Sequence, residues 1–147
     1  MGLPPHIAVR RIKNDLEDLE YRDDITVSSI GEGFSLPYRL GVRLDGITGY
    51  TAPGRTADEH EFDIILGEDF PYERPRIVWK TGIFHPNIMS PSEGGGVCIA
   101  DRDRWDFDSK LSDLILMVAD LVKNPNPYNP LVSESCTAAA EWLRNNA

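Results

Sequence analysis

The stretch Leu36-Pro37-Tyr38-Arg39-Leu40-Gly41-Val42-Arg43-Leu44 decides the fold, because an apolar side chain stands at every second position of it. Such alternation is typical of a strand with one buried face. Upstream, the run Ile25–Ile30 is closed by Gly31-Glu32-Gly33, which predicts another strand joined to this one by a tight turn. We therefore expect residues 25–44 to begin an antiparallel sheet.

Two further strands are predicted downstream of this pair. Residues 45–55 contain glycines and a proline without any period, which indicates a long hairpin loop. Alternation then returns at residues 60–66, and this run is the third strand. Because the prolines of residues 70–75 cannot continue a central strand, the fourth strand is expected at Arg76–Lys80.

Helical spacing flanks this four-stranded meander on both sides. The first helix is expected from Pro4-Pro5 to about residues 21–24, the second at Leu111–Val122 with Ser109 as its cap, and the last at Ser133–Asn145. Residues 81–108 show no period, and an irregular stretch of that length is usually functional. The prediction is an α+β fold with an N-terminal helix, a four-stranded antiparallel meander, a long active-site loop and two C-terminal helices, in a single domain over residues 1–147.

Composition limits the function classes. A formal charge of -9, from 24 acidic and 15 basic residues, disfavours a nucleic-acid partner. No apolar run is long enough for a membrane span, and residues 1–6 lack the features of a signal peptide. Two cysteines make no disulfide framework, and the scattered histidines form no metal pattern. We expect a cytoplasmic protein without a metal or cofactor.

The candidate chemistry lies between His85 and Ile99. Cys98 follows the glycines at 94–96, and His85-Pro86-Asn87 precedes that loop, so the segment supplies a thiol nucleophile and an amide donor for an oxyanion. Other interpretations stay open. A lone cysteine is more often a small buried side chain, as is expected for Cys136 on its apolar helix, and Asn87 can equally hold the loop backbone.

At this point the chain resembles a known family, the ubiquitin-conjugating enzymes. The resemblance rests on the order of several pieces: Phe70-Pro71-Tyr72-Glu73-Arg74-Pro75, His85-Pro86-Asn87, Val97-Cys98-Ile99, Trp105 and Asn126-Pro127-Tyr128-Asn129-Pro130-Leu131. No single piece is decisive, but their joint order is highly specific. The resemblance extends from about residue 7 to the end, and the usual last helix of the family has no counterpart here.

The resemblance implies that Cys98 accepts ubiquitin or a ubiquitin-like protein as a thioester from an activating enzyme and passes it to a lysine. A free thiol, with a pKa of about 8.5, then needs access more than a strong base. In this scheme Asn87 binds the oxyanion, and Asp101 and Asn129 orient the lysine. His85 and Pro86 support the loop.

The same resemblance implies two docking surfaces on what is expected to be a monomer. The activating enzyme would dock on Arg10, Arg11 and Lys13. Without the resemblance, these three residues would be interpreted as a solvated helix face. A ligase would dock near Pro71, Tyr72 and Phe107. Trp105 is expected to support the loop by packing.

Three departures from the family pattern accompany these matches. Asn129 stands where the family often has an aspartate, and an amide cannot attract an ammonium group as a carboxylate can. It can equally cap the last helix, with Pro130 in the first turn. The loop between Asn87 and Cys98 is several residues longer than usual, and the proline common after Trp105 is missing. These departures are those of a divergent or prokaryotic-type member.

Two alternative functions remain open at this level. One is a non-catalytic module of the same fold that binds ubiquitin-like proteins. The other is a cysteine hydrolase that uses Cys98 with His85, which requires the imidazole within hydrogen-bond reach of the sulfur.

Overall fold

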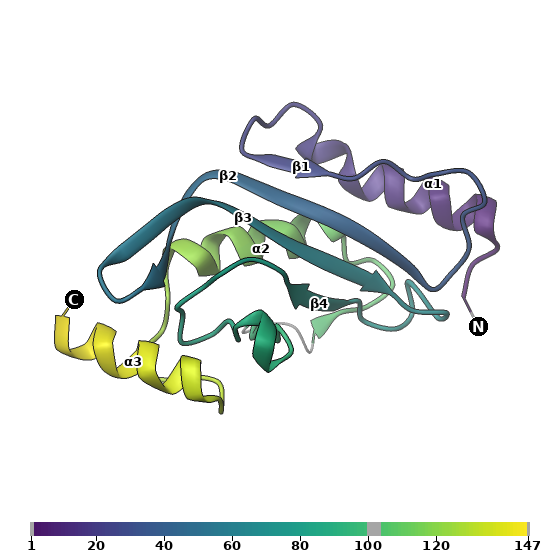
Figure 1. Cartoon of the computed structure of the whole chain (residues 1–147). Helices are drawn as coiled ribbons and strands as arrows, with labels where there is room; N and C mark the ends of the chain where they lie inside the picture. The colour runs from purple at the N-terminus through teal and green to yellow at the C-terminus, as the bar shows by residue number, and fades with distance from the viewer. Residues whose placement is uncertain (1, 100–103, 147) are drawn as a thin grey trace.

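A computed structural model describes residues 2–99 and 104–146 of the chain (Figure 1). The elements follow in the order α1 (Pro5–Leu16), η1 (Glu17–Leu19), β1 (Ile25–Val27), β2 (Tyr38–Ala52), β3 (Arg55–Leu66), β4 (Arg76–Trp79), η2 (Pro91–Glu93), α2 (Leu111–Lys123) and α3 (Glu134–Asn146). The strands form one antiparallel sheet in the order β1-β2-β3-β4. The predicted α+β architecture is therefore confirmed.

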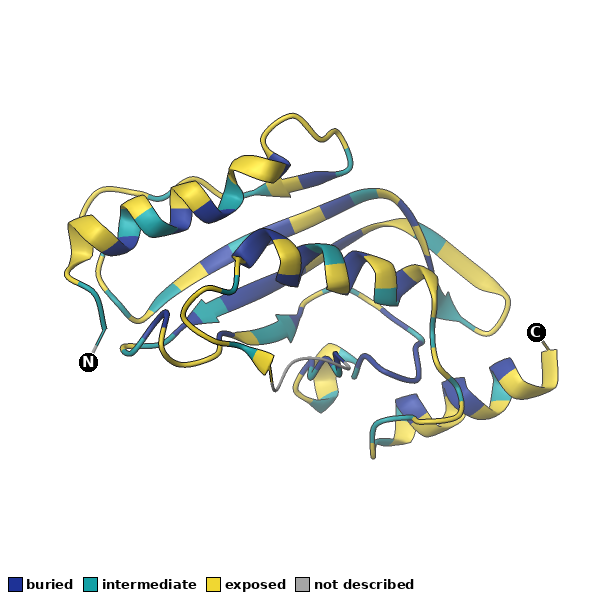
Figure 2. Cartoon of the chain, turned by 180° about the vertical axis from the view of Figure 1, so that it is seen from behind, coloured by how far each residue is buried: buried dark blue, intermediate teal, exposed yellow. Residues whose placement is uncertain are grey.

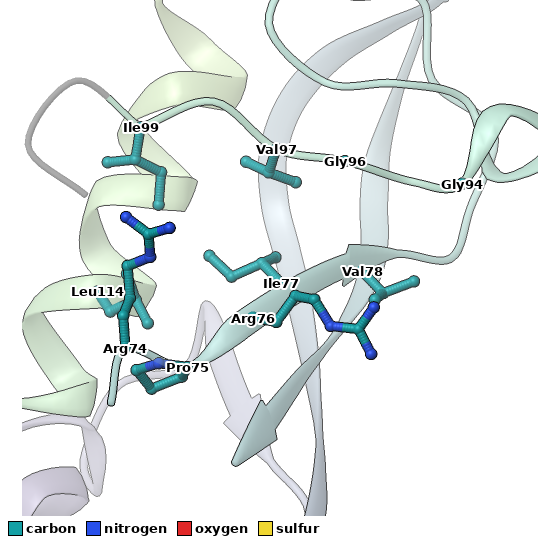
Figure 3. Close-up of a pocket in the computed structure, with 10 residues that line it drawn as sticks. All are labelled: Arg74, Pro75, Arg76, Ile77, Val78, Gly94, Gly96, Val97, Ile99 and Leu114. Atoms are coloured by element: carbon teal, nitrogen blue, oxygen red, sulfur yellow. The ribbon is translucent and has the colours of Figure 1, made fainter. Parts of the chain in front are cut away.

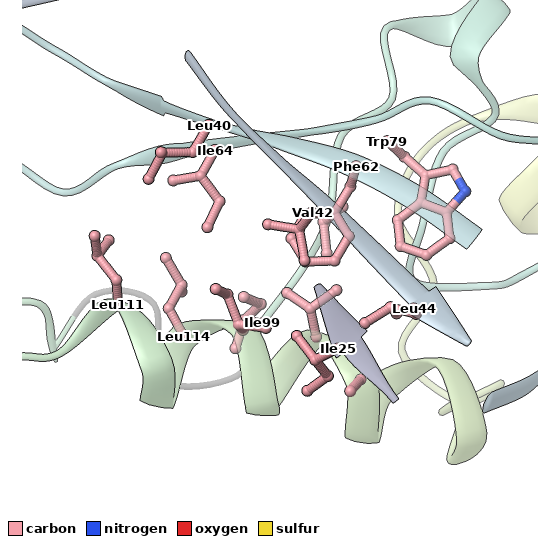
Figure 4. Packing of buried hydrophobic residues seen from close by; sticks show 14 of the residues in the cluster. Ile25, Leu40, Val42, Leu44, Phe62, Ile64, Trp79, Ile99, Leu111 and Leu114 are labelled. Atoms are coloured by element: carbon pink, nitrogen blue, oxygen red, sulfur yellow. The ribbon is translucent and has the colours of Figure 1, made fainter. Parts of the chain in front are cut away.

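The core lies between the sheet and α2. Alternate residues of β2 and β3 are buried, as the period of two predicted, and they face the apolar side of α2 (Figure 4). The Phe62 and Trp79 rings stack at 5.6 Å, which joins β3 to β4 inside this layer. Ile99, one residue beyond Cys98, belongs to the same cluster and lies near Leu114 of α2. The active-site segment is thus anchored directly in the core.

Helices cover the sheet unequally. Seen from behind, α2 crosses one face of the sheet with its buried side turned inward (Figure 2). Helix α1 lies beside β1 and packs on α2, whereas α3 lies at the opposite end of the molecule (Figure 1). Among the described residues, no helix has both the length and the apolar character needed to cross a bilayer.

The loop expected at residues 45–55 is wrong, because most of this stretch is strand. β2 runs to Ala52 and β3 begins at Arg55, with only Pro53-Gly54 between them. The pairing shifts between Asp45 and Gly49, around Gly46 at φ 74°. A bulge of this kind interrupts the alternation of side chains without ending the strand. The sequence therefore loses its period of two at residues that still belong to a strand.

The first hairpin also differs from the prediction. β1 ends at Val27, and residues 28–37 form a connection much longer than a tight turn. The cause is local: the Ser28 hydroxyl accepts the Gly41 N–H at 2.9 Å. A side chain then satisfies a backbone group that would otherwise bond to a longer β1.

Two predicted helix caps are wrong. Lys110, rather than Ser109, is the N-cap residue of α2, and the Leu111 N–H is accepted by the Asp15 carboxylate of α1 at 3.2 Å. Helix α3 begins at Glu134, and the Ser133 hydroxyl caps it by accepting the Cys136 N–H at 3.1 Å. Asn129 therefore lies too far upstream to cap this helix.

Candidate active site

His85 is buried and braces the loop through both ring nitrogens. Its Nδ1 accepts the Asn87 N–H at 3.0 Å, so Nε2 carries the proton and donates to the Leu121 carbonyl at 2.7 Å. That carbonyl is free because Pro125, four residues on, has no N–H. Burial lowers the pKa of His85 to about 4 and keeps the ring neutral. No ring nitrogen is left for a thiol, which removes the hydrolase alternative.

The side-chain amide of Asn87 is likewise hydrogen-bonded through both its oxygen and its nitrogen. Oδ1 accepts the Asn126 N–H at 2.7 Å, and Nδ2 donates to the carbonyls of Asn126 at 3.2 Å and Asn129 at 3.1 Å. A side-chain amide has two hydrogens to donate, and both are used here. In this structure Asn87 joins the loop before the cysteine to the turn before α3.

Backbone contacts hold Cys98 beside Asn87. The Cys98 N–H donates to the Asn87 carbonyl at 2.9 Å, Ile88 pairs with Val97, and the Met89 N–H donates to the Gly96 carbonyl at 2.8 Å. These contacts pair residues 87–89 with residues 96–98 and close the base of a loop. Residues 90–95 form this loop, hereafter the 90–95 excursion.

Gly95 presses the excursion onto β4. Its carbonyl accepts the Trp79 N–H at 2.8 Å, and its φ is 66°. A Cβ at this position would lie 2.5 Å from the Trp79 carbonyl oxygen, so only glycine fits. The close backbone approach at Gly95 is thus made to the chain's own sheet edge.

Cys98 itself is half-buried and free, between the buried side chains of Val97 and Ile99. Beneath this segment lies a cavity of about 250 Å³ between the start of β4 and α2 (Figure 3). Its lining is mainly apolar, and Arg74 and Arg76 stand at β4 (Figure 3). By contrast Cys136 is fully buried in α3, as predicted, and burial raises the pKa of its thiol.

Of the two residues predicted to orient the lysine, Asn129 and Asp101, the structure describes only Asn129. The Asn129 side chain is exposed, next to the backbone carbonyl that Asn87 holds. Asp101 lies outside the described residues. The exposed side chains of Tyr128 and Val132 flank this position, so the turn presents an open surface near the base of the cysteine segment.

The candidate ligase surface is an aromatic pair. The Tyr72 and Phe107 rings lie 5.2 Å apart and are 58% and 46% exposed. Pro71 is buried, and its carbonyl accepts the Trp105 Nε1–H at 2.8 Å. Trp105 therefore joins the two loops that carry the pair, which supports a packing role.

The three basic residues of α1 do not form one surface. Arg11 donates from Nε to Asp15 at 2.8 Å and from Nη2 to the Ser109 carbonyl at 2.7 Å, and its guanidinium lies 5.1 Å from the Phe107 ring centroid. Arg11 is thus a structural tie between α1 and the start of α2. Arg10 and Lys13 are exposed and remain available for docking.

Glu93 is a site residue that the sequence analysis missed. Its carboxylate accepts the Ser135 N–H at 2.9 Å, the Ser135 hydroxyl and the Ser90 N–H at 3.2 Å. The Ser135 hydroxyl and N–H are the main reasons why the pKa of Glu93 falls to about 2. The spacing Ser90-Pro91-Ser92-Glu93 is a capping box and could have been recognised; the contact with Ser135 could not.

Within the described ranges, no group of three or more histidine, cysteine or acidic side chains could hold a metal ion.

Comparisons with known proteins agree with this geometry. The sequence model of the family "Ubiquitin-conjugating enzyme" matches residues 51–147. "Ubiquitin-conjugating enzyme E2 13" of Saccharomyces cerevisiae is 25% identical, over 76% of this chain and 85% of the relative. "Ubiquitin-conjugating enzyme E2 27" of Arabidopsis thaliana is 26% identical, over 95% and 69%.

A solved structure points the same way. The structure of S. cerevisiae Ubc12 superposes with a TM-score of 0.73 at 29% identity and covers 95% of this chain and 72% of that one. The family match spans more than half of the chain, and it includes the cysteine segment whose geometry is described above. The chain belongs to the ubiquitin-conjugating enzyme family.

Proposed function

We propose that this chain carries ubiquitin or a ubiquitin-like protein as a thioester on Cys98 and transfers it to a lysine amine. The observation that carries the proposal is the placement of Cys98: a free, half-buried thiol held beside the His85–Asn87 turn by its own backbone N–H. The family match gives the reaction class. Residues 1–147 act as one domain in this proposal.

Charging is a thioester exchange. The Cys98 thiolate attacks the carbonyl carbon of the modifier's thioester on the activating enzyme, a new carbon–sulfur bond forms, and the activating enzyme's thiolate leaves with the electron pair of the old one. The incoming carbonyl is already activated, so the thiol needs exposure more than a neighbouring base. This agrees with a site in which the nearest histidine is fully engaged with backbone.

Discharge is the more demanding step. A lysine with a pKa of about 10.4 must first lose the proton of its ammonium form. The neutral amine then attacks the thioester carbonyl, an amide bond forms, the Cys98 Sγ–carbon bond breaks with its electron pair leaving on sulfur, and the nitrogen releases a second proton to that thiolate or to water. We propose that the exposed side chain of Asn129 orients the lysine amine. Because this side chain is an amide, it does so by hydrogen bonding rather than by charge.

Asn87 serves this chemistry mainly as a brace. For its amide to bind the tetrahedral oxyanion, Nδ2 must release the carbonyl of Asn126 or of Asn129. The oxyanion role proposed from the family pattern therefore requires a movement of the turn before α3.

The experiment is a charging assay with an activating enzyme, ATP and a panel of ubiquitin-like modifiers. We expect a thiol-sensitive adduct on the wild-type chain, none on Cys98→Ala, and a thiol-resistant oxyester on Cys98→Ser. Cys136→Ala is the matched control, since that thiol is fully buried, and it should charge normally. No adduct with any cognate set would overturn the proposal and leave a non-catalytic binding module of the same fold.

Docking of the activating enzyme gives a separate prediction. Arg10→Ala and Lys13→Ala should slow charging at low salt, and the difference should shrink at high salt because the screening length falls from about 10 Å at 0.1 M to about 3 Å at 1 M. The measurement is the initial charging rate at both salt concentrations. Arg55→Ala, at the exposed tip of the β2–β3 hairpin, is the control; an equal effect there would contradict a specific docking surface.

The exposed pair Tyr72 and Phe107 is proposed as the ligase surface. Two aromatic rings at the tips of neighbouring loops, with Trp105 fixing the loops to each other, suit an apolar contact with a partner.

A further inference from the structure

The 90–95 excursion is tied to the first turn of α3 by one carboxylate. Glu93 accepts both donors of Ser135, and Figure 1 shows the excursion beside the start of this helix. The same carboxylate accepts the Ser90 N–H and so closes the excursion on itself. The contact joins residues 42 positions apart in the chain.

The contact suits a carboxylate. The first N–H groups of a helix have no partner within the helix, and the helix dipole favours negative charge there. Ser133 caps the Cys136 N–H, and Glu93 takes the Ser135 N–H, so the two side chains satisfy neighbouring donors. Glu93 is charged throughout the pH range in which a lysine can be discharged.

Glu93 lies on a short path to Cys98. Two residues on, Gly95 hydrogen-bonds to β4, and Gly96 hydrogen-bonds to Met89. Cys98 follows after Val97, with its N–H donated to the Asn87 carbonyl. Gly95, Gly96 and Cys98 thus lie in one hydrogen-bonded backbone unit, and Glu93 attaches the first turn of α3 to it.

The other end of the contact leads to the surface near the cysteine. Residues 126–135 are hereafter the 126–135 segment. Asn87 holds Asn126 and Asn129, the Pro86 carbonyl accepts the Leu131 N–H at 2.9 Å, Arg144 donates to the Pro127 carbonyl at 2.7 Å, and Glu93 holds Ser135. The first two come from the turn before the excursion. Among the hydrogen bonds of the described residues, those of Glu93 link the segment to the excursion that leads into Cys98.

We propose that Glu93 is a positioning residue that fixes the 126–135 segment relative to Cys98 and so serves lysine discharge more than charging. This inference rests on the proposed thioester function. Charging needs an exposed thiol, whereas discharge needs the lysine aligned between the thioester and the Asn129 side of the site. Small misplacements of a reacting group cost far more rate than losses of simple access.

The test separates the two steps with pre-charged enzyme. Wild type, Glu93→Gln, Glu93→Ala and Glu134→Gln are charged, the activating enzyme is quenched, and the thioester is chased with free lysine or with hydroxylamine. Hydroxylamine is small and largely neutral at pH 7, so it needs little positioning. Glu134 is the neighbouring, exposed acidic residue of the same helix turn and serves as the matched control.

We expect Glu93→Ala to charge within about two-fold of wild type and to lose about ten-fold or more in lysine discharge. Hydroxylamine discharge should stay near wild type, and Glu134→Gln should match wild type in all three assays. Ser135→Ala removes the hydroxyl contact but keeps the N–H contact, so its loss should be smaller. The double variant should be no worse than Glu93→Ala, because both changes remove the same contact.

Two outcomes would overturn the inference: equal loss in charging and in both discharges, which indicates general damage, or no loss of lysine discharge. If Glu93→Ala fails to fold, as judged from its urea midpoint, the lysine-to-hydroxylamine ratio of Ser135→Ala decides in its place. A wild-type chain that forms no thioester refutes the proposed function instead, and the two failures are distinct.

Discussion

At the residue scale, the His85–Asn87 turn acts as a set of backbone clamps. His85 holds the last turn of α2, and Asn87 holds the turn before α3, so every hydrogen-bonding atom of both side chains is used within the fold. Cys98 depends on these clamps for its position, since its N–H is bound to the Asn87 carbonyl. The candidate active-site segment is thus built from residues that hold one another.

Replacing Asn87 tests this arrangement. Asn87→Ala leaves the Asn126 N–H and two carbonyls without their partner, and unpaired buried groups cost about 1–3 kcal/mol each. With partial access of water to the turn, we expect a loss of about 2–3 kcal/mol in the free energy of unfolding, measured in urea. Asn129→Ala, which removes only an exposed side chain, should stay within about 0.5 kcal/mol. Lost activity at unchanged stability would instead mark Asn87 as a free oxyanion donor.

His85 gives a pH dependence of stability. Its pKa is about 4 in the folded chain and 6.5 in the reference state, so between these values the unfolded chain binds the proton and the folded chain does not. Stability from this group is complete above pH 6.5 and falls as the pH drops toward 4. At pH 5 the loss is about 2 kcal/mol, at about 1.4 kcal/mol for each pH unit.

The measurement is a set of urea midpoints from pH 5 to pH 8. His85→Gln removes the titrating group, so its stability should change less with pH than that of the wild type. An identical pH dependence in the two proteins would show that other groups account for it.

At the element scale, the helices are joined by charged side chains that act across elements. Asp15 of α1 accepts the Leu111 N–H, which is the first N–H of α2, and also pairs with Arg11 at 2.8 Å. Arg11 in turn donates to the Ser109 carbonyl just before α2. The start of α2 therefore has no cap of its own and depends on α1.

Removing Asp15 should cost more than an ordinary cap. Asp15→Ala leaves the buried Leu111 N–H without its acceptor, and the half-buried Arg11 loses its carboxylate and keeps the Ser109 carbonyl. We therefore expect a loss of about 2–4 kcal/mol, compared with about 1 kcal/mol for a typical cap. The measurement is urea unfolding. Asp18→Ala is the control, because Asp18 reaches Lys110 and Ser112 at the same helix start but is 58% exposed. Its loss should be below about 1 kcal/mol, and equal losses would contradict the capping role of Asp15.

At the scale of the whole molecule, the active-site segment is the part that connects the sheet, α2 and α3. Trp142 of α3 contacts the Tyr50 ring at 5.2 Å and the Phe84 ring at 6.3 Å. Phe84 immediately precedes His85, so α3 is attached to the same segment that carries the clamps. The described residues therefore show no domain boundary at which the fold could unfold in independent parts.

We expect cooperative unfolding as a result. Far-ultraviolet circular dichroism and tryptophan fluorescence should give coincident urea transitions, because Trp79, Trp105 and Trp142 report from the core, the loops that carry Tyr72 and Phe107, and α3. In Trp142→Phe, the remaining tryptophans should again follow the circular dichroism. A fluorescence change that precedes the loss of secondary structure would contradict a single domain over residues 1–147.

The sequence predicted the elements that have their own period. The alternation at Leu36–Leu44 and at residues 60–66, and the helical spacing at Leu111–Val122, all correspond to observed elements, because a half-buried element repeats its buried side chain at the period of its backbone. Residues 45–55 were predicted as a hairpin loop, and their strand character was missed because a bulge broke that period. The Ser109 and Asn129 caps were wrong because the true partners, Asp15 and Ser133, depend on where the helices lie and begin.

By itself, the sequence determined the order of helices and strands and the segment that carries the candidate nucleophile, because periodicity and the Asn87–Cys98 motif are local in the chain. Only the tertiary structure decided what those residues do for one another. It turned Asn87 and His85 into clamps, Arg11 into a tie between helices, and Glu93 into a link to α3. Each of these contacts spans 36 or more residues, and no local pattern encodes which distant backbone group will be left without a partner.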